Sequence, residues 1–294
     1  VTPLNLTREN DSLHVSTRVF IGAAAVGNLV VFAPLKADVV GVYDVSTGTF
    51  DTSTSTGGLT MDSKFAGAAA VGNLVVFAPF RADVVGVYDV STGTFDASTS
   101  TGSLTMDSKF LGAAAVGNLV VFAPYNADVV GVYDVSTGTF DTSVSTGSLT
   151  INTKFGGAAA VGNLVVFAPS NADVVGMYDV STGTFDASTT TGSLTMNSKF
   201  EGAAAVGNLV VFAPSNADVV GVYDVSTGTF DTSVSTGSLI MDGKFFGAAA
   251  VGNLIVFAPY NAYVVGTFMI PSPPLPSPTS PPSPTPPPLL PPPL

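Results

Sequence analysis

The sequence predicts an all-β protein: a six-bladed β-propeller of four-stranded blades, followed by a disordered polyproline II tail. Two observations predict the propeller. The segment GAAAVGNL recurs at a constant step of 45 residues, and each copy contains four short strand patterns. Repeats of about 20–50 residues form arrays of one supersecondary unit, and four strands per repeat of about 40–50 residues is typical of a propeller blade. The segment begins at Gly22, Gly67, Gly112, Gly157, Gly202 and Gly247.

The copy between Lys64 and Thr105 shows how each blade is expected to form. Small residues in Phe65–Val71 suit an inner strand, where strands crowd around the axis, and three alanines between glycines cannot nucleate a helix. A Gly-Asn hairpin signal leads to the continuous apolar strand Leu74–Phe77, which we expect to be buried on both faces. The third strand, Asp83–Asp89, and a fourth beginning at Thr94–Asp96 follow, separated by a Ser-Thr-Gly turn.

The repeats delimit one domain, residues 1–270, and a proline-rich tail, residues 271–294. The sixth copy lacks a fourth strand, because Thr267–Ile270 runs directly into proline. One period before Phe50-Asp51, the segment Leu4–Thr7 alternates apolar and polar residues, so residues 1–19 are expected to supply a ring-closing strand and a lead-in. A longer parent chain would add blades. A β-solenoid is the rival fold, although its coils are usually much shorter than 45 residues.

Charge and composition exclude several classes of partner. The net charge is −12, and 19 of the 21 acidic residues are Asp. Such a surface repels phosphate, so neither nucleic acid nor an anionic membrane surface is expected as a partner. No apolar run reaches the ~18 residues that span a bilayer. The absence of cysteine removes disulfides, thiolate metal sites and cysteine nucleophiles. The chain begins at Val1 without a leader, as expected of a processed form or a fragment.

Three features recur in the copies: a Phe-x-Gly-Ala-Ala-Ala-Val-Gly-Asn opening, an apolar second strand, and a stretch like Val87–Phe95 in which a tyrosine and a turn precede an aromatic residue. Together they make residues 20–270 resemble the kelch family of β-propellers, including its galactose-oxidase-like blades. Phe95 stands where that family usually has Trp, and Ala78-Pro79 replaces the kelch double glycine. The resemblance implies a propeller that is often closed by a split blade.

Two zones differ most between the copies. They are expected to share one face, since the loop between strands two and three lies at the same edge as the linker into strand one. The first zone follows each Ala-Pro pair: Leu35, Lys36, Phe80, Arg81, Tyr125, Asn126, Ser170, Asn171, Ser215, Asn216, Tyr260 and Asn261. The second follows each opening phenylalanine: Ile21, Ala66, Leu111, Gly156, Glu201 and Phe246.

These zones predict a face that binds a protein or peptide ligand. Aromatic residues and Arg anchor interfaces, and exposed Phe80, Tyr125 and Tyr260 are costly for a soluble domain without a partner. The alternative interpretation is that these loops differ because nothing constrains them.

The repeated charged residues have structural interpretations. One Asp in each of five copies precedes a Ser-Thr-Gly turn and is expected to cap it, rather than to bind calcium, because no copy shows the dense alternation of oxygen ligands of a calcium loop. These residues are Asp44, Asp89, Asp134, Asp179 and Asp224. Five lysines are expected to pair with neighbouring Asp at the surface: Lys64, Lys109, Lys154, Lys199 and Lys244. The aspartates that open the third strand are Asp38, Asp83, Asp128, Asp173 and Asp218.

The sequence does not predict an enzyme, a cofactor or a metal site. His14, the single histidine, lies outside the repeats, so neither a Ser-His-Asp triad nor a zinc, copper or iron site has its ligands there. Arg81 is the only arginine in the repeats, whereas sialidases, which are six-bladed propellers, use three. Two carboxylates suffice for glycosidase chemistry. However, repetition of every Asp by symmetry favours a scaffold role.

The tail indicates a second function. Ser280–Pro288 resembles the hydroxyproline-rich segments of plant and green-algal wall glycoproteins, and Asn5 and Asn10 begin glycosylation sequons, which are useful only in a secreted chain. Proline-rich tails also bind SH3 or WW domains inside cells. The two hypotheses are therefore an interaction module and a structural glycoprotein of an extracellular matrix or cell wall tethered by its tail. The compartment stays open, with the extracellular one slightly favoured, and a glycan is a further candidate partner.

Overall fold

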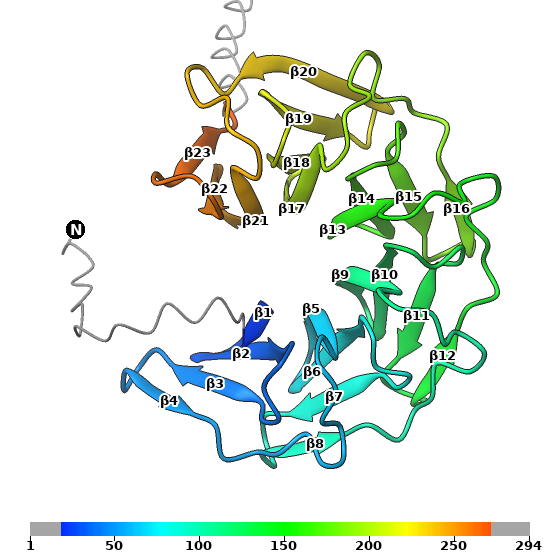
Figure 1. Ribbon diagram of the computed structural model, residues 1–294, viewed down its shortest axis with the longest axis vertical. Helices are drawn as coiled ribbons and strands as arrows, with labels where there is room; N and C mark the ends of the chain where they lie inside the picture. Colours follow the sequence, from blue (N-terminus) through cyan, green and yellow to red (C-terminus); the bar gives the residue numbers. More distant parts are fainter. Residues whose placement is uncertain (1–18, 272–294) are drawn as a thin grey trace, which may run out of the picture.

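The protein is a β-propeller, and every regular element in its described part is a β-strand (Figure 1). The structure is a computed structural model that describes residues 19–271. Six blades follow one another around a central axis in chain order, with the inner strands toward the axis (Figure 1). This arrangement confirms the predicted fold class and excludes the rival solenoid. The described residues contain no helix long and apolar enough to cross a membrane.

Each blade is an antiparallel meander in the order in which its strands occur in the chain. The innermost strands are β1 (Phe20–Val26), β5 (Phe65–Val71), β9 (Phe110–Val116), β13 (Phe155–Val161), β17 (Phe200–Val206) and β21 (Phe245–Val251). The second strands are β2 (Leu29–Pro34), β6 (Leu74–Pro79), β10 (Leu119–Pro124), β14 (Leu164–Pro169), β18 (Leu209–Pro214) and β22 (Leu254–Pro259). The third strands are β3 (Gly41–Asp44), β7 (Gly86–Asp89), β11 (Gly131–Asp134), β15 (Gly176–Asp179), β19 (Val219–Asp224) and β23 (Gly266–Met269). The outer strands are β4 (Thr49–Asp51), β8 (Thr94–Asp96), β12 (Thr139–Asp141), β16 (Thr184–Asp186) and β20 (Thr229–Ser235).

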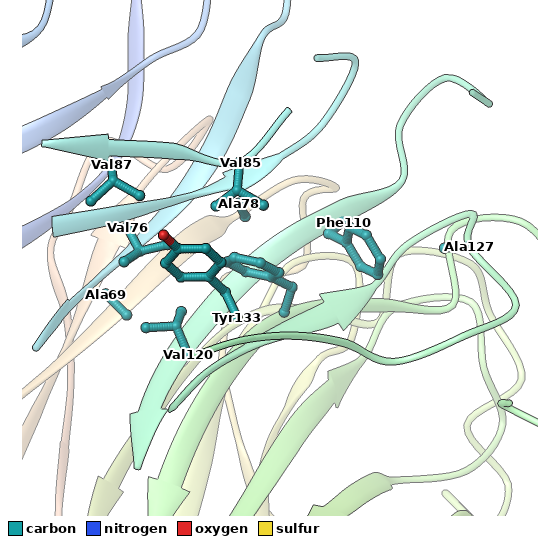
Figure 2. Close-up of a cluster of buried hydrophobic side chains, with 10 residues drawn as sticks. Ala69, Val76, Ala78, Val85, Val87, Phe110, Val120, Ala127 and Tyr133 are labelled. Carbon is teal, nitrogen blue, oxygen red and sulfur yellow. The ribbon is translucent and has the colours of Figure 1, made fainter. Parts of the chain in front are cut away.

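The core lies between the blades rather than within any one of them. Five clusters of buried apolar side chains join consecutive blades, from the first pair to the last. Figure 2 shows the cluster between blades 2 and 3, where Val76 of β6 meets Val120 of β10 and Tyr133 of β11. The second strand is buried on both faces, as predicted, because each blade is covered by a neighbour on either side. Val75 and Val76 point to opposite faces of β6, and both are completely buried.

The glycine of each opening segment allows the inner strands to approach one another. A Cβ atom at Gly67 of β5 would lie 2.5 Å from the backbone oxygen of Leu111 in the next blade. At Gly202 of β17 it would lie 2.7 Å from the carbonyl carbon of Gly247. Both distances are too short for a real contact, so these positions require glycine. The close approach explains why the predicted inner strand is built from the smallest residues.

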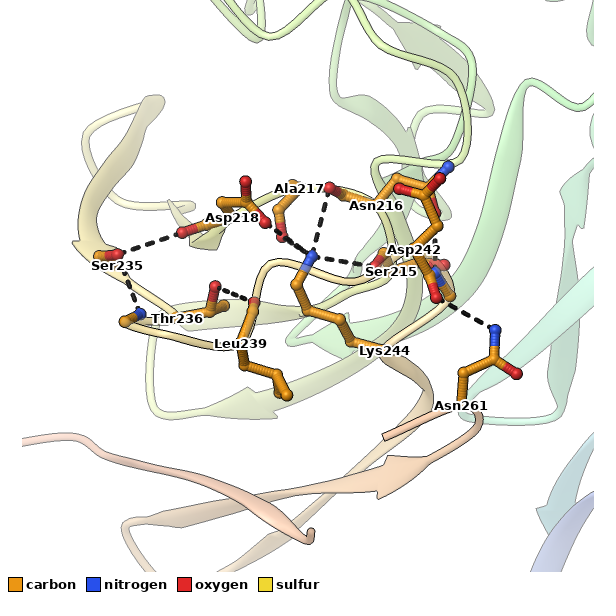
Figure 3. A network of polar contacts seen from close by, with 12 residues as sticks. Ser215, Asn216, Ala217, Asp218, Ser235, Thr236, Leu239, Asp242, Lys244 and Asn261 are labelled. Carbon is orange, nitrogen blue, oxygen red and sulfur yellow. Dashed lines mark hydrogen bonds and ion pairs between the residues drawn. The ribbon is translucent and has the colours of Figure 1, made fainter. Parts of the chain in front are cut away.

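The lysines that the sequence places at the surface are in fact fully buried, and this prediction was wrong. Each pairs with an Asp of the preceding blade, as expected, but its ammonium group also donates to backbone carbonyls of that blade. Figure 3 shows Lys244, whose Nζ lies 2.8 Å from Asp218 Oδ1 and 3.2 Å from the oxygen of Ala217. The Asp carboxylates remain about half exposed, so the pair spans the boundary between core and solvent. The equivalent pairs are Asp38–Lys64, Asp83–Lys109, Asp128–Lys154 and Asp173–Lys199.

The aspartates before the Ser-Thr-Gly turns cap those turns, as predicted. Asp89 Oδ1 accepts from the backbone N and from Oγ of Ser91, at 2.8 and 2.6 Å, and Gly93 N donates to the Asp89 carbonyl at 2.8 Å. The hydrogen bond from the Ser91 side chain, followed by that from its backbone, holds the pKa of Asp89 below its usual value. The same arrangement recurs at the equivalent aspartates of the other four-stranded blades.

The two ends of the array differ from its interior. Blade 6 has three strands among the described residues. Within the same residues, only Ala258 Cβ, at 3.5 Å, lies near the position that a Cβ atom at Gly247 would take. Tyr263 is 97% exposed, and it stands where other copies carry the paired Asp. Val19 likewise stands where other copies carry the buried lysine. The predicted ring-closing segment Leu4–Thr7, His14, and the tail from residue 272 lie outside the described residues.

Candidate functional site

One of the two zones that differ most between the copies lines the central cavity. This cavity has a volume of about 240 Å³ and is lined by the same three-residue segment from each of the six inner strands. The first residue of each segment belongs to the variable zone that follows the opening phenylalanine. These residues are Ile21, Ala66, Leu111, Gly156, Glu201 and Phe246. Apart from Glu201, the side chains in the cavity wall are therefore apolar, and the glycines and alanines also bring backbone to it.

The second variable zone borders the first. The loops after the Ala-Pro pairs are tied by backbone hydrogen bonds to the linkers that enter the inner strands, as in Phe80 N to the oxygen of Lys64 at 2.9 Å and Lys109 N to the oxygen of Phe80 at 2.8 Å. Side chains of the two zones also touch. The Phe246 and Tyr260 rings lie 5.8 Å apart between centroids, and Ser170 Oγ lies 2.8 Å from Glu201 Oε1. We call the two zones together the loop face.

The loop face is less exposed than its sequence suggests. Phe80 and Tyr125 are half-buried, because their rings pack against one another with centroids 5.7 Å apart, whereas Tyr260 is 47% exposed. The expectation of three exposed aromatic residues is therefore correct for Tyr260 only. Leu35, Ser170 and Ser215 are buried, and Lys36 is half-buried.

The amide residues of the loop face have structural contacts. Asn126 Nδ2 donates to the Asp107 oxygen at 3.1 Å, and its Oδ1 accepts from Thr153 N at 2.9 Å, so its side chain bridges the linkers on either side of blade 3. Asn171, Asn216 and Asn261 donate to the equivalent linker carbonyls. Arg81 stands at this position in blade 2 and pairs with the Asp107 carboxylate at 3.1 Å, in an exposed ion pair. These residues fix the loops that follow the Ala-Pro pairs to the neighbouring linkers.

Glu201 is the one acidic group at the cavity. Its position in β17 places it between blades 4 and 5, and only 6% of it is exposed. Oε1 accepts from Ser170, whereas Oε2 has no hydrogen-bond partner among the described residues. A Cβ atom at Gly156 would lie 2.8 Å from Oε2, so the glycine of the neighbouring blade leaves the space that the carboxylate fills.

Burial changes the acidity of this cluster. Loss of hydration raises the pKa of Glu201 to about 7, against the weaker lowering effect of the hydroxyls of Ser170 and Ser198. Loss of hydration also raises the pKa of Tyr125, and the negative charge of Glu201 adds to that effect. Glu201 is therefore about half ionised near neutral pH.

The sequence contained one signal for this carboxylate. Glu201 is the only glutamate within the repeats, and it occupies a position where the other copies have apolar residues or glycine. Its burial and its orphaned oxygen follow from contacts between blades, which a single repeat does not reveal.

Across the described residues, no group of three His, Cys, Asp or Glu side chains is arranged to hold a metal ion. The sequon residues Asn5 and Asn10 lie outside the described residues.

Comparison with known proteins identifies the fold but no family. No family model matches the chain, and no curated protein matches it. Among solved structures, virginiamycin B lyase from Staphylococcus aureus is similar with a TM-score of 0.68 at 12% identity, covering 85% of this chain and 84% of that one. The WD40 repeats of RRP9 give 0.62 at 10% identity, covering 86% and 77% of the two chains. A chain of the nidogen/laminin complex gives 0.56 at 12% identity, covering 81% and 86%. Likeness at such low identity shows the propeller fold alone.

Proposed function

We propose that this protein is a non-enzymatic interaction module, related to kelch propellers, that binds a protein or peptide through the loop face. The observation that carries the proposal is the convergence of the variable residues. Five blade interfaces repeat almost the same side chains, whereas of the two zones that differ most, one lines the central cavity and the other borders the first on the same face. A surface that differs between blades offers an asymmetric set of contacts on a symmetric scaffold.

The chemistry of the loop face suits a peptide. Tyr260 and Phe246 form an aromatic pair at one side of the cavity, and Phe80 and Tyr125 form another. Exposed Arg81 adds a donor whose present partner, Asp107, is itself exposed, so this ion pair costs little to rearrange. Aromatic and Arg side chains are the residues that most often anchor protein interfaces. Similar propellers include both an enzyme and a member of a protein complex, so the proposal rests on these side chains and not on the fold.

The test is a peptide-display selection on the wild-type protein, followed by affinity measurements on variants. Replacing Phe80, Arg81, Tyr125 and Tyr260 with Ser is expected to abolish binding of the selected peptides. Since Phe80 and Tyr125 are half-buried, the pair Arg81→Ser and Tyr260→Ser is measured as well, because both of these side chains are exposed.

Val45→Ser is the matched control. Val45 is 56% exposed and follows β3, at the opposite edge of the blade. The proposal requires that this variant bind like the wild type. Equal binding by the folded loop-face variants would show that the ligand binds elsewhere.

The second candidate is a structural glycoprotein of an extracellular matrix or cell wall. It is favoured by the Ser-Pro and Pro-Pro sequence of residues 271–294 and by the sequons at Asn5 and Asn10. Mass spectrometry of the native protein separates the two functions. Hydroxyproline and sugar on the tail peptide would support the matrix protein. An unmodified tail would support an adaptor, whose tail is then a candidate ligand for SH3 or WW domains.

A further inference from the structure

Blade 6 exposes a face that the other blades bury. In blades 1 to 5 this face packs against the next blade, and the valine before the third strand, Val85 in blade 2, is 1% exposed. The equivalent Val265 of blade 6 is 60% exposed, and Val251, at the end of β21, is 69% exposed. Blade 6 lies at one end of the array (Figure 1), and none of the buried clusters among the described residues joins it to blade 1. We call the following residues the open face of blade 6: Val251, Val256, Ala258, Tyr263, Val265 and Met269.

Two substitutions make the open face neutral where the other copies are acidic. Tyr263 occupies the position of the aspartate that pairs with the buried lysine of the next blade, as Asp83 pairs with Lys109. Met269 occupies the position of the aspartate that caps the following turn, as Asp89 does. Tyr263 is 97% exposed and Met269 is 60% exposed. Contiguous exposed apolar surface marks an interaction site, so this face is expected to have an uncharged, apolar partner.

The chain itself contains a segment with that chemistry. Residues 272–294 consist only of Pro, Ser, Thr and Leu, so their side chains carry no charge. Proline-rich segments form polyproline II rods, which dock in aromatic-lined apolar grooves. Such a rod has few backbone donors but keeps all of its carbonyl acceptors. The Tyr263 hydroxyl is a donor that suits those carbonyl groups.

The tail begins beside the open face. Ile270 is buried with the cluster between blades 5 and 6, and Pro271 follows it, so the tail leaves the array from blade 6. In the polyproline II conformation, residues 272–294 extend over ~70 Å. The longest strand of blade 6, β21, spans ~23 Å. The tail is therefore long enough to turn back and cross the whole face.

Two other occupants fit the open face less well. A further repeat would bring its buried lysine, whose aspartate partner is replaced here by Tyr263. A second copy would bring Val19 in place of that lysine. However, its following blades would continue the curve of the array and would meet blade 1 (Figure 1). The tail brings neither an unpaired charge nor further blades.

We propose that residues 272–294 dock on the open face of blade 6 as a polyproline II rod and cover it within the same chain. Prolines and leucines of the rod contact Val251, Val265 and Met269, and the Tyr263 hydroxyl donates to a carbonyl group of the rod. The proposal does not depend on peptide binding by the loop face. A docked tail is withheld from SH3 or WW domains until they displace it.

The first test measures binding of a synthetic peptide with the sequence of residues 271–294 by calorimetry. Its target is a full-length variant in which a Gly-Ser sequence of equal length replaces residues 272–294, so that the open face is uncovered. This tail-replaced variant is expected to bind the peptide saturably. The wild type is expected to bind it at least about threefold more weakly, because its own tethered tail competes at an effective concentration on the order of 1 mM.

Substitutions in the tail-replaced variant locate the site. Tyr263→Asp restores the residue that the five other copies carry, so it is compatible with the fold, and it is expected to weaken peptide binding at least about tenfold. Val265→Ser is expected to weaken binding as well. Val45→Ser is its matched control, because Val45 is 56% exposed, nearly as much as Val265, but follows β3 in blade 1. Arg81→Ser, on the loop face, is the second control, and both controls are expected to leave the affinity unchanged.

The second test detects docking of the tail in the wild-type chain by NMR. The sequence contains six methionines, so methyl-¹³C methionine gives six signals, and the Met269→Leu variant assigns the one on the open face. Replacing the tail by the Gly-Ser sequence is expected to shift the Met269 signal. The signals of Met61 and Met106, which lie in the linkers that enter blades 2 and 3, are expected to stay in place.

Several outcomes would overturn the proposal. No saturable binding of the peptide, or equal binding by Tyr263→Asp, would show that the tail does not recognise the open face. An unchanged Met269 signal after tail replacement would show that the tail does not dock in the intact chain. Loss of binding in Arg81→Ser would place the tail on the loop face instead. A wild-type dimer in light scattering that Tyr263→Asp converts to a monomer would make a second copy the occupant.

Discussion

The buried lysines between blades yield the most direct test of how the array is held together. Lys109 is completely buried, with Nζ 2.8 Å from Asp83 Oδ1 and 3.0 and 3.2 Å from the backbone oxygens of Arg81 and Ala82. Lys109→Met keeps an unbranched apolar side chain, one atom shorter than lysine, and removes its donors. Two carbonyl groups and one carboxylate then lose their partner.

The magnitude follows from the burial of each acceptor. The Ala82 oxygen is buried, so leaving it unpaired costs about 1–3 kcal/mol, and the half-buried contact at Arg81 adds about 1 kcal/mol. The Asp83 side chain is 56% exposed and regains hydration, so it contributes little. The free energy of unfolding is therefore expected to fall by about 2–4 kcal/mol. For a domain of this size, the corresponding fall in melting temperature is about 4–16 °C.

The assay is urea and thermal unfolding followed by circular dichroism. Lys36→Met is the control, because it removes the same charge from a half-buried side chain that forms no ion pair within residues 19–271. It is expected to change stability by less than about 0.5 kcal/mol. Asp83→Asn is expected to cost less than Lys109→Met, since the lysine keeps its two carbonyl acceptors. A loss at Lys109 no larger than that at Lys36 would refute the reasoning, because it would mean that the buried donors contribute nothing.

Three further predictions follow from single groups. Burial raises the pKa of Glu201 to about 7, so between about pH 4.5 and 7 the folded protein holds a proton there that the unfolded chain has lost. The free energy of unfolding should therefore fall by about 3 kcal/mol as pH rises through this window. Glu201→Gln should remove that pH dependence in unfolding measurements. Gly202→Ala should lower the free energy of unfolding by about 1–3 kcal/mol, because its Cβ atom would meet the backbone of the next blade. Gly247→Ala, at the same repeat position, should be nearly neutral. An equal loss at Gly247 would show that backbone packs against β21 as well. Carbon NMR should give a pKa for the Asp89 carboxyl below its ordinary value of 3.8. Its hydrogen bonds therefore stabilise the protein at neutral pH, and this stabilisation is lost as pH falls through the lowered pKa. A pKa at or above 3.8 would contradict the turn cap.

The strands and turns of each blade were predictable from local sequence. The hairpin between Val26 and Leu29 follows from Gly-Asn, and the cap at Asp89 follows from the turn that it precedes. The third strand is shorter than predicted in most blades, beginning at Gly86 rather than Asp83, because Val84 keeps only an isolated bridge to Ser100. The repeat period and the absence of helical patterns were sufficient to define a propeller.

The candidate site was predictable in part. Comparison of the copies found both variable zones and their shared face, because a meander fixes which loops lie at the same edge. The comparison of copies did not predict that the Asn126 side chain hydrogen-bonds to two linkers. It also did not predict that the Phe80 and Tyr125 rings pack against one another and are half-buried. Those contacts join residues of different blades, whose separation in the chain says nothing about how their side chains meet.

The sequence by itself determined the blade: its four strands, its turns, and its small inner residues follow from patterns within 45 residues. The tertiary structure decided what happens between blades. It buried Lys109 beneath the loop of the preceding blade, required glycine at Gly202, and enclosed Glu201 beside Gly156. The physical reason is that almost all of the apolar burial lies at the interfaces between blades, so the environment of a side chain depends on the neighbouring copy and not on its own repeat.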